Sequence, residues 1–168
     1  ANSSDHVFMF RHPDDLYVYM TGFNGVYRCA YDKTKKELVS SVLHVGDIGG
    51  GGGYVDAPGS SARFSRPRQG VFVKNKEYEA QGKEDVYDFY VCDHNNNAIR
   101  KVTPDGEVST FAGRGSVGVD GKVWGWIDGD ARETARFREP TGICYDEEEE
   151  IFYVADRENK RIRTISVE

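Results

Sequence analysis

Two copies of one pattern decide the fold of this chain: FYVCDHNNNAIR at residues 89–100 and FYVADRENKRIR at residues 152–163. In both copies aromatic and β-branched residues alternate with other side chains, which is typical of half-buried β-strands. The polar stretch in the middle predicts the turn of a hairpin. A weaker copy, residues 16–28, precedes the middle one by 73 positions (89 − 16 = 73). Internal repetition of this kind predicts a repeat architecture.

Further elements recur around these hairpins. Residues 108–113 predict an outer strand, and residues 42–46 predict its counterpart in the first copy. Each outer strand is followed by a Gly-rich crossover, residues 46–67 and 113–140, that ends in Ala-Arg-Phe-x-x-Pro. The apolar runs after Pro67 and Pro140 predict innermost strands, so the order is inner, second, third and outer strand. That order is the plan of a β-propeller blade.

The fold class is therefore all-β, with about three four-stranded blades in one partial propeller over residues 1–168. The expected blades cover approximately residues 5–66, 67–139 and 140–168, and the last one stops after its third strand. A closed ring commonly needs at least about four blades, so we expect half of a roughly six-bladed propeller. The missing half, or self-association, is then an expected partner. Residues 131–136 contain good helix formers and predict a short helical turn inside the second crossover.

The spacing Val-x-Asp-x-x-Asn-x-x-Ile-Arg, which starts at Val91 and again at Val154, resembles the NHL repeat. Together with Phe111-Ala112-Gly113 and the Ala-Arg-Phe-x-x-Pro motif, it is similar to a group of gut-bacterial, Bacteroides-type surface proteins in which an IPT/TIG domain precedes an NHL propeller. The first copy departs from the pattern, with Met20 and Phe23 where Asp and Asn are expected. The resemblance implies an extracytoplasmic location, at the cell surface or in the periplasm.

Bulk properties exclude some functions. The net charge is −6 with scattered basic residues, which argues against nucleic-acid binding. No apolar run is long enough to span a membrane. The three cysteines fall in strand-like runs and are expected to be small buried residues. The four histidines lack metal-ligand spacing, so neither a metal nor another cofactor is expected.

Long loops on a rigid scaffold are where binding usually resides, and both crossovers are predicted to emerge on one face with the hairpin turns. Aromatic rings beside Asp, Asn and Arg suit carbohydrate, because the rings cover C–H surface and the polar groups take hydroxyls. Alternatively, the Trp rings fold back and pin the long loop. The candidate ligand-binding residues are Trp124, Trp126, Tyr54, Asp120, Asp128, His94 and Arg157.

Residues that recur in successive copies are expected to shape the scaffold, because an active site usually needs a residue once and a scaffold needs it in every blade. Asx side chains at a strand end, for instance, can bond nearby backbone N–H groups. The structural repeat residues are Asp93, Asn96, Arg100, Asp156, Asn159, Arg163, Pro67 and Pro140.

The sequence carries no nucleophile elbow, phosphate loop or catalytic dyad. It is best interpreted as a non-catalytic binding or scaffold module of an extracytoplasmic surface protein, with a glycan bound through the long crossovers. Two alternatives stay open, because one fold hosts many functions. The first is a propeller hydrolase or lyase with a metal in the channel, and the second is a protein-interaction propeller.

Overall fold

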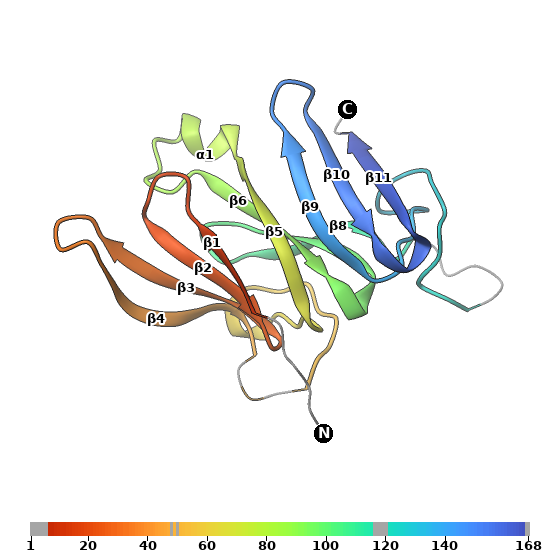
Figure 1. Ribbon diagram of the computed structural model, residues 1–168, viewed down its shortest axis with the longest axis horizontal. Helices are drawn as coiled ribbons and strands as arrows, with labels where there is room; N and C mark the ends of the chain where they lie inside the picture. Colours follow the sequence, from red (N-terminus) through yellow and green to blue (C-terminus); the bar gives the residue numbers. More distant parts are fainter. Residues whose placement is uncertain (1–6, 48, 50, 116–120, 167–168) are drawn as a thin grey trace.

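The computed structural model describes residues 7–47, 49, 51–115 and 121–166, and it contains three antiparallel sheets that stand side by side (Figure 1). The first sheet has the order β1-β2-β3-β4. The second has the order β5-β6-β7-β8 and the third the order β9-β10-β11. Within each sheet the chain steps outward from strand to strand, as the sequence predicts, and the fold is all-β and propeller-like.

The strands follow one another along the chain with a few short helical segments between them. The strands are β1 (Phe8–Arg11), β2 (Tyr17–Gly22), β3 (Gly25–Asp32), β4 (Glu37–Gly46), β5 (Pro67–Lys74), β6 (Tyr87–Asp93), β7 (Ala98–Val102), β8 (Val108–Gly113), β9 (Pro140–Asp146), β10 (Ile151–Asp156) and β11 (Arg161–Ser166). The helical segments are α1 (Lys76–Ala80) and the 3-10 turns η1 (Gly59–Ser61), η2 (His94–Asn96) and η3 (Arg157–Asn159).

Two apolar layers lie between neighbouring sheets. Tyr19 and Val26 of the first sheet pack with Phe89 and Val91 of the second in one buried cluster. The alternate residues of β6 point the other way, so that Tyr90 and its neighbours pack against the third sheet. Alternation along β6 therefore supplies both interfaces at once, because successive side chains in a strand point to opposite faces.

The uniform offset of 73 residues expected for the weak copy is wrong for one of its two strands. The turn of the first hairpin is closed by the pair Gly22 and Gly25, whereas that of the β6–β7 hairpin is closed by Asp93 and Ala98. The offset is thus 71 along β2 (93 − 22 = 71) and 73 along β3 (98 − 25 = 73). The reason is that the first turn is two residues shorter. Tyr19 consequently takes the place of Tyr90 (90 − 19 = 71), and both are buried.

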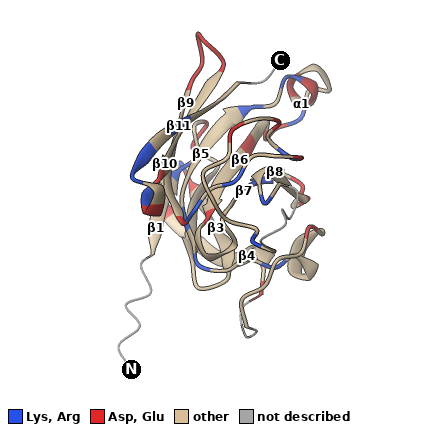
Figure 2. Ribbon diagram, turned by 90° about the vertical axis from the view of Figure 1, so that its right-hand side faces the viewer, with Lys and Arg blue, Asp and Glu red and all other residues tan. Residues whose placement is uncertain are grey.

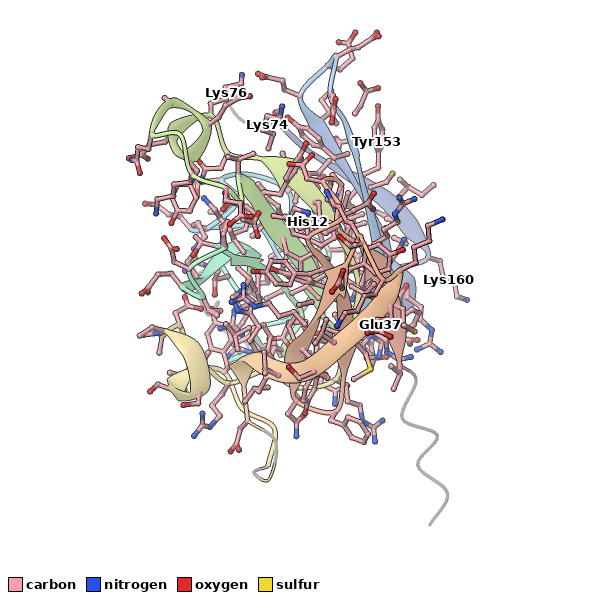
Figure 3. The ribbon with its side chains drawn as sticks, turned by 90° about the vertical axis from the view of Figure 1, so that its left-hand side faces the viewer. His12, Glu37, Lys74, Lys76, Tyr153 and Lys160 are labelled. Carbon is pink, nitrogen blue, oxygen red and sulfur yellow. The ribbon has the colours of Figure 1, made fainter. Side chains whose placement is uncertain are left out.

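The two ends of the sheets carry different loops. The hairpin turn between β9 and β10 meets α1, where Lys76 Nζ lies 2.7 Å from Glu150 Oε1. The β6–β7 and β10–β11 turns meet the crossovers at the opposite end, which we call the loop face. The grouping of the crossovers with these turns was predicted from the sequence. His12 lies inside, between the first two sheets, while Lys74 and Lys76 lie at the α1 end (Figure 3).

The residues from Ala131 to Arg136 include the single turn that was predicted, in which the Asp130 carbonyl accepts from the amides of Thr134 and Ala135. The expectation for the cysteines needs correction. Of the three cysteines, Cys92 alone is buried. Cys144 is exposed, because β9 presents it on the outer face of the third sheet, opposite Tyr153. No helix among the described residues is long and apolar enough to cross a membrane.

Candidate functional site

The repeated Arg, Asp and Asn residues hold each crossover against a hairpin. Arg100 is completely buried, and its Nη1 donates to Asp93 Oδ2 at 2.7 Å and to the carbonyl of Arg63 at 2.9 Å. Its Nη2 donates to the carbonyl of Val55 and to Asp56 Oδ1, both at 2.8 Å. A planar guanidinium suits this task because its fork satisfies several acceptors at once.

The third sheet repeats the arrangement. Arg163 Nη1 donates to Asp156 Oδ2 at 2.9 Å and to the carbonyl of Arg136 at 3.1 Å. Its Nη2 donates to the carbonyl of Ile127 and to Asp128. Each of these five residues matches one in the second sheet, so the sequence repeat produces a repeated crossover clasp.

The Asn of each repeat adds a further hydrogen bond between the hairpin turn and the crossover. Asn96 donates to the carbonyl of Gly53, and Asn159 donates to that of Gly125, both at 2.7 Å. These contacts align the two crossovers at an offset of 72 (125 − 53 = 72). Asp56 therefore corresponds to Asp128, Tyr54 to Trp126, and Gly52 to Trp124.

Tyr54 makes structural contacts with the second sheet. Its hydroxyl lies 2.5 Å from Thr110 Oγ1 on β8. Its ring lies 4.9 Å from the guanidinium carbon of Arg100 and 4.0 Å from that of Arg114. Trp126, in the equivalent position, is 63% exposed and has Arg161 4.4 Å from its ring.

A groove of about 1030 Å³ runs along β11, between the third sheet and the crossover. Asp128 lies in it with 86% of its side chain exposed. The wall combines charged groups with the rings of Phe111 and Phe137. Its lining residues include Phe111, Ala112, Asp128, Asp130, Ala135, Phe137, Arg161, Ile162, Arg163 and Ile165.

A second group of side chains on the loop face consists of two contacting sets, one at Trp124 and one at Glu139. The Trp124 ring lies 4.4 Å from the guanidinium carbon of Arg138 and 4.8 Å from Lys122 Nζ. Glu139 follows Arg138 directly and its Oε2 lies 3.1 Å from Arg157 Nη1. We call these five residues the loop-face cluster.

Most of the loop-face cluster has no counterpart of the same type in the second sheet. Arg138 and Glu139 stand where Ser65 and Arg66 stand one repeat earlier (138 − 65 = 73), and Trp124 stands where Gly52 does. Trp124 and Arg157 were predicted from the sequence, whereas Arg138, Glu139 and Lys122 were not. Departure from the repeat is the signal that would have found Arg138 and Glu139.

The sequence predicted that His94 is displayed in a loop, but the structure shows that it is buried. Its Nδ1 lies 3.2 Å from the carbonyl of Pro140, and its Nε2 lies 3.4 Å from Glu139 Oε2. Burial lowers the pKa of His94, although the Pro140 carbonyl opposes this shift. His94 therefore joins the second and third sheets beneath the loop-face cluster.

The loop face and the opposite end, where α1 lies, differ in charge. Glu147, Glu148 and Glu149 make the β9–β10 turn acidic, while Arg157, Lys160 and the start of β11 bring Lys and Arg to the β10–β11 turn (Figure 2). Among the residues that the structure describes, no group of three or more His, Cys, Asp or Glu side chains could hold a metal ion. Asp120, the remaining candidate, lies outside the described residues.

The fold and the clasp define an all-β, propeller-like chain, and residues 137–165 match the NHL repeat family. No curated protein sequence matches the chain. Three solved structures from Bacteroides resemble it closely over 99–100% of its length.

Two of them are described as auxiliary nutrient binding proteins. The one from Bacteroides thetaiotaomicron is 44% identical with a TM-score of 0.89, and the one from Bacteroides ovatus is 37% identical with a TM-score of 0.90. The third, described as a putative phosphatase from Bacteroides thetaiotaomicron, is 45% identical with a TM-score of 0.91. The chain spans only 36–38% of the length of these proteins.

Proposed function

We propose that this chain is part of a non-catalytic binding module of an extracytoplasmic protein, and that it binds carbohydrate at the loop-face cluster. The observation that carries the proposal is the Trp124 ring flanked by Arg138 and Lys122 at a position where the preceding repeat has glycine. The resemblance to two auxiliary nutrient binding proteins supports a binding role.

The five side chains offer the chemistry that a sugar requires. The indole can cover the apolar C–H face of a pyranose ring, while Arg138, Glu139 and Arg157 can exchange hydrogen bonds with its hydroxyls. The cluster contains three cationic side chains and one carboxylate, with Glu158 as a second carboxylate 3.2 Å from Arg157, and a guanidinium binds carboxylate through two parallel bonds. The cluster therefore favours an acidic polysaccharide over a neutral one.

Trp124 and Trp126 differ in what stands at the equivalent position of the first crossover, which is Gly52 for Trp124 and Tyr54 for Trp126. An aromatic residue occupies the Trp126 position in both crossovers, which fits a scaffold role, whereas Trp124 is specific to the second crossover. This difference makes Trp126→Ala a matched control for Trp124→Ala, since the two lie in the same loop.

Binding of polygalacturonate and of neutral amylose should be measured by calorimetry and by tryptophan emission in a Trp126→Phe variant, where Trp124 is the sole indole. We expect polygalacturonate to bind more tightly, Trp124→Ala to weaken it at least tenfold, and Trp126→Ala to leave it nearly unchanged. If neither acidic nor neutral polysaccharides bind, carbohydrate is the wrong ligand class. If binding survives Trp124→Ala, the loop-face cluster is the wrong site.

A further inference from the structure

Glu139 joins the second and third sheets through both its side chain and its backbone. Its Oε2 lies 3.1 Å from Arg157 Nη1 and 3.4 Å from His94 Nε2. Its backbone N–H donates to Asn97 Oδ1 at 2.9 Å. Glu139 has φ 51°, a conformation that is uncommon for residues other than glycine and that persists where surrounding contacts impose it. The turn of the second sheet therefore holds Glu139 where its carboxylate meets both side chains.

The contacts of His94 fix the place of its proton. Nδ1 lies 3.2 Å from the carbonyl oxygen of Pro140, and a carbonyl oxygen can only accept a hydrogen bond. Neutral His94 therefore carries its proton on Nδ1, and Nε2 presents a lone pair to Glu139 Oε2. Two acceptors thus face each other with no hydrogen between them. A proton taken up at Nε2 would turn this contact into a charge-assisted hydrogen bond.

Charged groups from three elements face His94. Burial lowers the pKa of His94, the positive charges of Arg68 on β5 and of Arg157 on η3 lower it further, and the Glu139 carboxylate of the second crossover opposes them. Asp93, the neighbour of His94 in the chain, has its carboxylate in the clasp instead. An anion bound beside the two arginines would offset their charge, so His94 would then take up a proton more readily.

Neither member of the His94–Glu139 pair follows the repeat. His94 stands where the third sheet has Arg157 (157 − 94 = 63), and Glu139 stands where the first crossover has Arg66 (139 − 66 = 73). Residues that shape the scaffold recur from sheet to sheet, as the clasp does. The departure of both residues from the repeat therefore indicates a role in binding rather than in the fold.

We propose that an acidic group of the ligand binds at Arg157 in competition with Glu139, and that His94 takes up a proton from solvent at Nε2 when it does. The proton draws the Glu139 carboxylate toward His94, which leaves the Arg157 guanidinium to the carboxylate of the ligand. This coupling rests on the proposed function, because it acts at the same loop-face cluster. Binding of an acidic polysaccharide then strengthens as the pH falls, whereas binding of a neutral one does not.

Calorimetry with polygalacturonate and with its fully methyl-esterified form, at two pH values and constant ionic strength, tests the coupling. We expect polygalacturonate to bind at least about threefold more tightly at about pH 5.5 than at about pH 7.5. Its binding heat should depend on the ionisation enthalpy of the buffer, which reports the proton uptake. The esterified polymer has the same sugar rings without their charge, so its affinity should be the same at both pH values.

Three variants identify the groups. Glu139→Gln removes the competing charge, so at the higher pH it should already bind polygalacturonate as tightly as the parent protein does at the lower pH. His94→Gln can still donate to the Pro140 carbonyl but cannot take up a proton, so it should lose the proton uptake and the pH dependence. The matched control is Glu158→Gln, because Glu158 also lies beside Arg157, at 3.2 Å, and this variant keeps the His94–Glu139 pair. It should retain the proton uptake.

The outcomes separate this coupling from the proposed function. Equal affinity for polygalacturonate at both pH values would overturn the coupling and leave the proposed function standing. A pH dependence that persists in Glu139→Gln would do the same, and this variant changes a side chain that is 40% exposed, so it does not depend on the folding of the buried His94→Gln. If neither polymer binds at either pH, both the coupling and the proposed function are overturned.

Discussion

Asp56 and Asp128 hold the same position in successive crossovers, but within the described part of the chain Asp56 alone accepts hydrogen bonds from an outer strand, through the amide and hydroxyl of Thr110. The exposed fractions differ as well. The Asp56 side chain is 37% exposed beside a fully buried Arg100, whereas the Asp128 side chain is 86% exposed beside an Arg163 that is 11% exposed. Identical sequence motifs therefore stand in unequal dielectric surroundings.

We expect Arg100→Lys to lower the free energy of unfolding by about 3 kcal/mol or more, because an ammonium cannot satisfy four acceptors and leaves Asp93 buried and poorly paired. Arg163→Lys should cost about 1 kcal/mol, since water reaches Asp128. Urea denaturation followed by circular dichroism would measure both. Equal losses would contradict the view that the two clasps differ in burial.

The pH dependence of stability should report on His44. Burial, assisted by nearby Arg28, lowers the pKa of His44 to about 4, against an opposing contact of Nε2 with the Thr103 carbonyl at 3.2 Å. Asp85 and Asp105 also oppose the shift. Because the unfolded chain binds this proton more tightly, the stability due to neutral His44 is complete above pH about 6.5 and is lost as the pH falls toward 4.

We expect His44→Gln to flatten the decline in unfolding free energy between pH 7 and pH 4.5 by about 2 kcal/mol. Parallel urea titrations of both proteins at each pH give the difference directly, since acidic groups elsewhere contribute equally to both. Parallel curves for the two proteins would show that His44 is not the group responsible.

Close packing in the second sheet makes Gly70 sensitive to substitution. A Cβ there would lie 2.3 Å from Phe89 Cζ and 2.7 Å from the carbonyl oxygen of Tyr90. Gly70→Ala should therefore cost about 2–3 kcal/mol through overpacking. At Gly142 the close neighbour is the flexible end of Gln69, so Gly142→Ala should cost less than about 1 kcal/mol. Thermal unfolding of the two variants beside the parent protein would measure both losses.

Thiol labelling should separate the cysteines. Cys144 is exposed, whereas Cys92 is buried and burial raises the pKa of its thiol. Because the thiolate is the reactive form, Ellman's reagent should modify Cys144 at least a hundredfold faster than Cys92. The rapid phase should vanish in Cys144→Ser. Its persistence in that variant would place another thiol at the surface.

Much of the strand order was predictable because residues 89–100 and 152–163 repeat both their alternation and their turn residues. Alternation predicts which side chains face a neighbouring sheet, and the Pro and Gly positions predict where strands end. The first hairpin was harder, because its turn is two residues shorter and the alignment slips along β2 only.

The site was less predictable for a physical reason. Trp124 and Trp126 are alike in sequence, yet one has Arg138 and Lys122 near its ring and the other has Arg161. Lys122 and Arg138 belong to the same crossover as Trp124, whereas Arg161 lies on β11, 35 positions from Trp126 (161 − 126 = 35). His94 likewise proved to be buried against Pro140, a contact that exists only once the second and third sheets pack.

The sequence by itself determined the all-β class, the order of strands within each sheet and the residues that recur as clasps, since these depend on local periodicity and on repetition. Tertiary structure alone decided which clasp is buried, which cysteine and which tryptophan are exposed, and where the groove lies. The reason is that burial depends on the neighbouring sheet: Tyr90 packs against the third sheet, whereas its repeat partner Tyr153 lies on the outer face of that sheet, more than a third exposed (Figure 3).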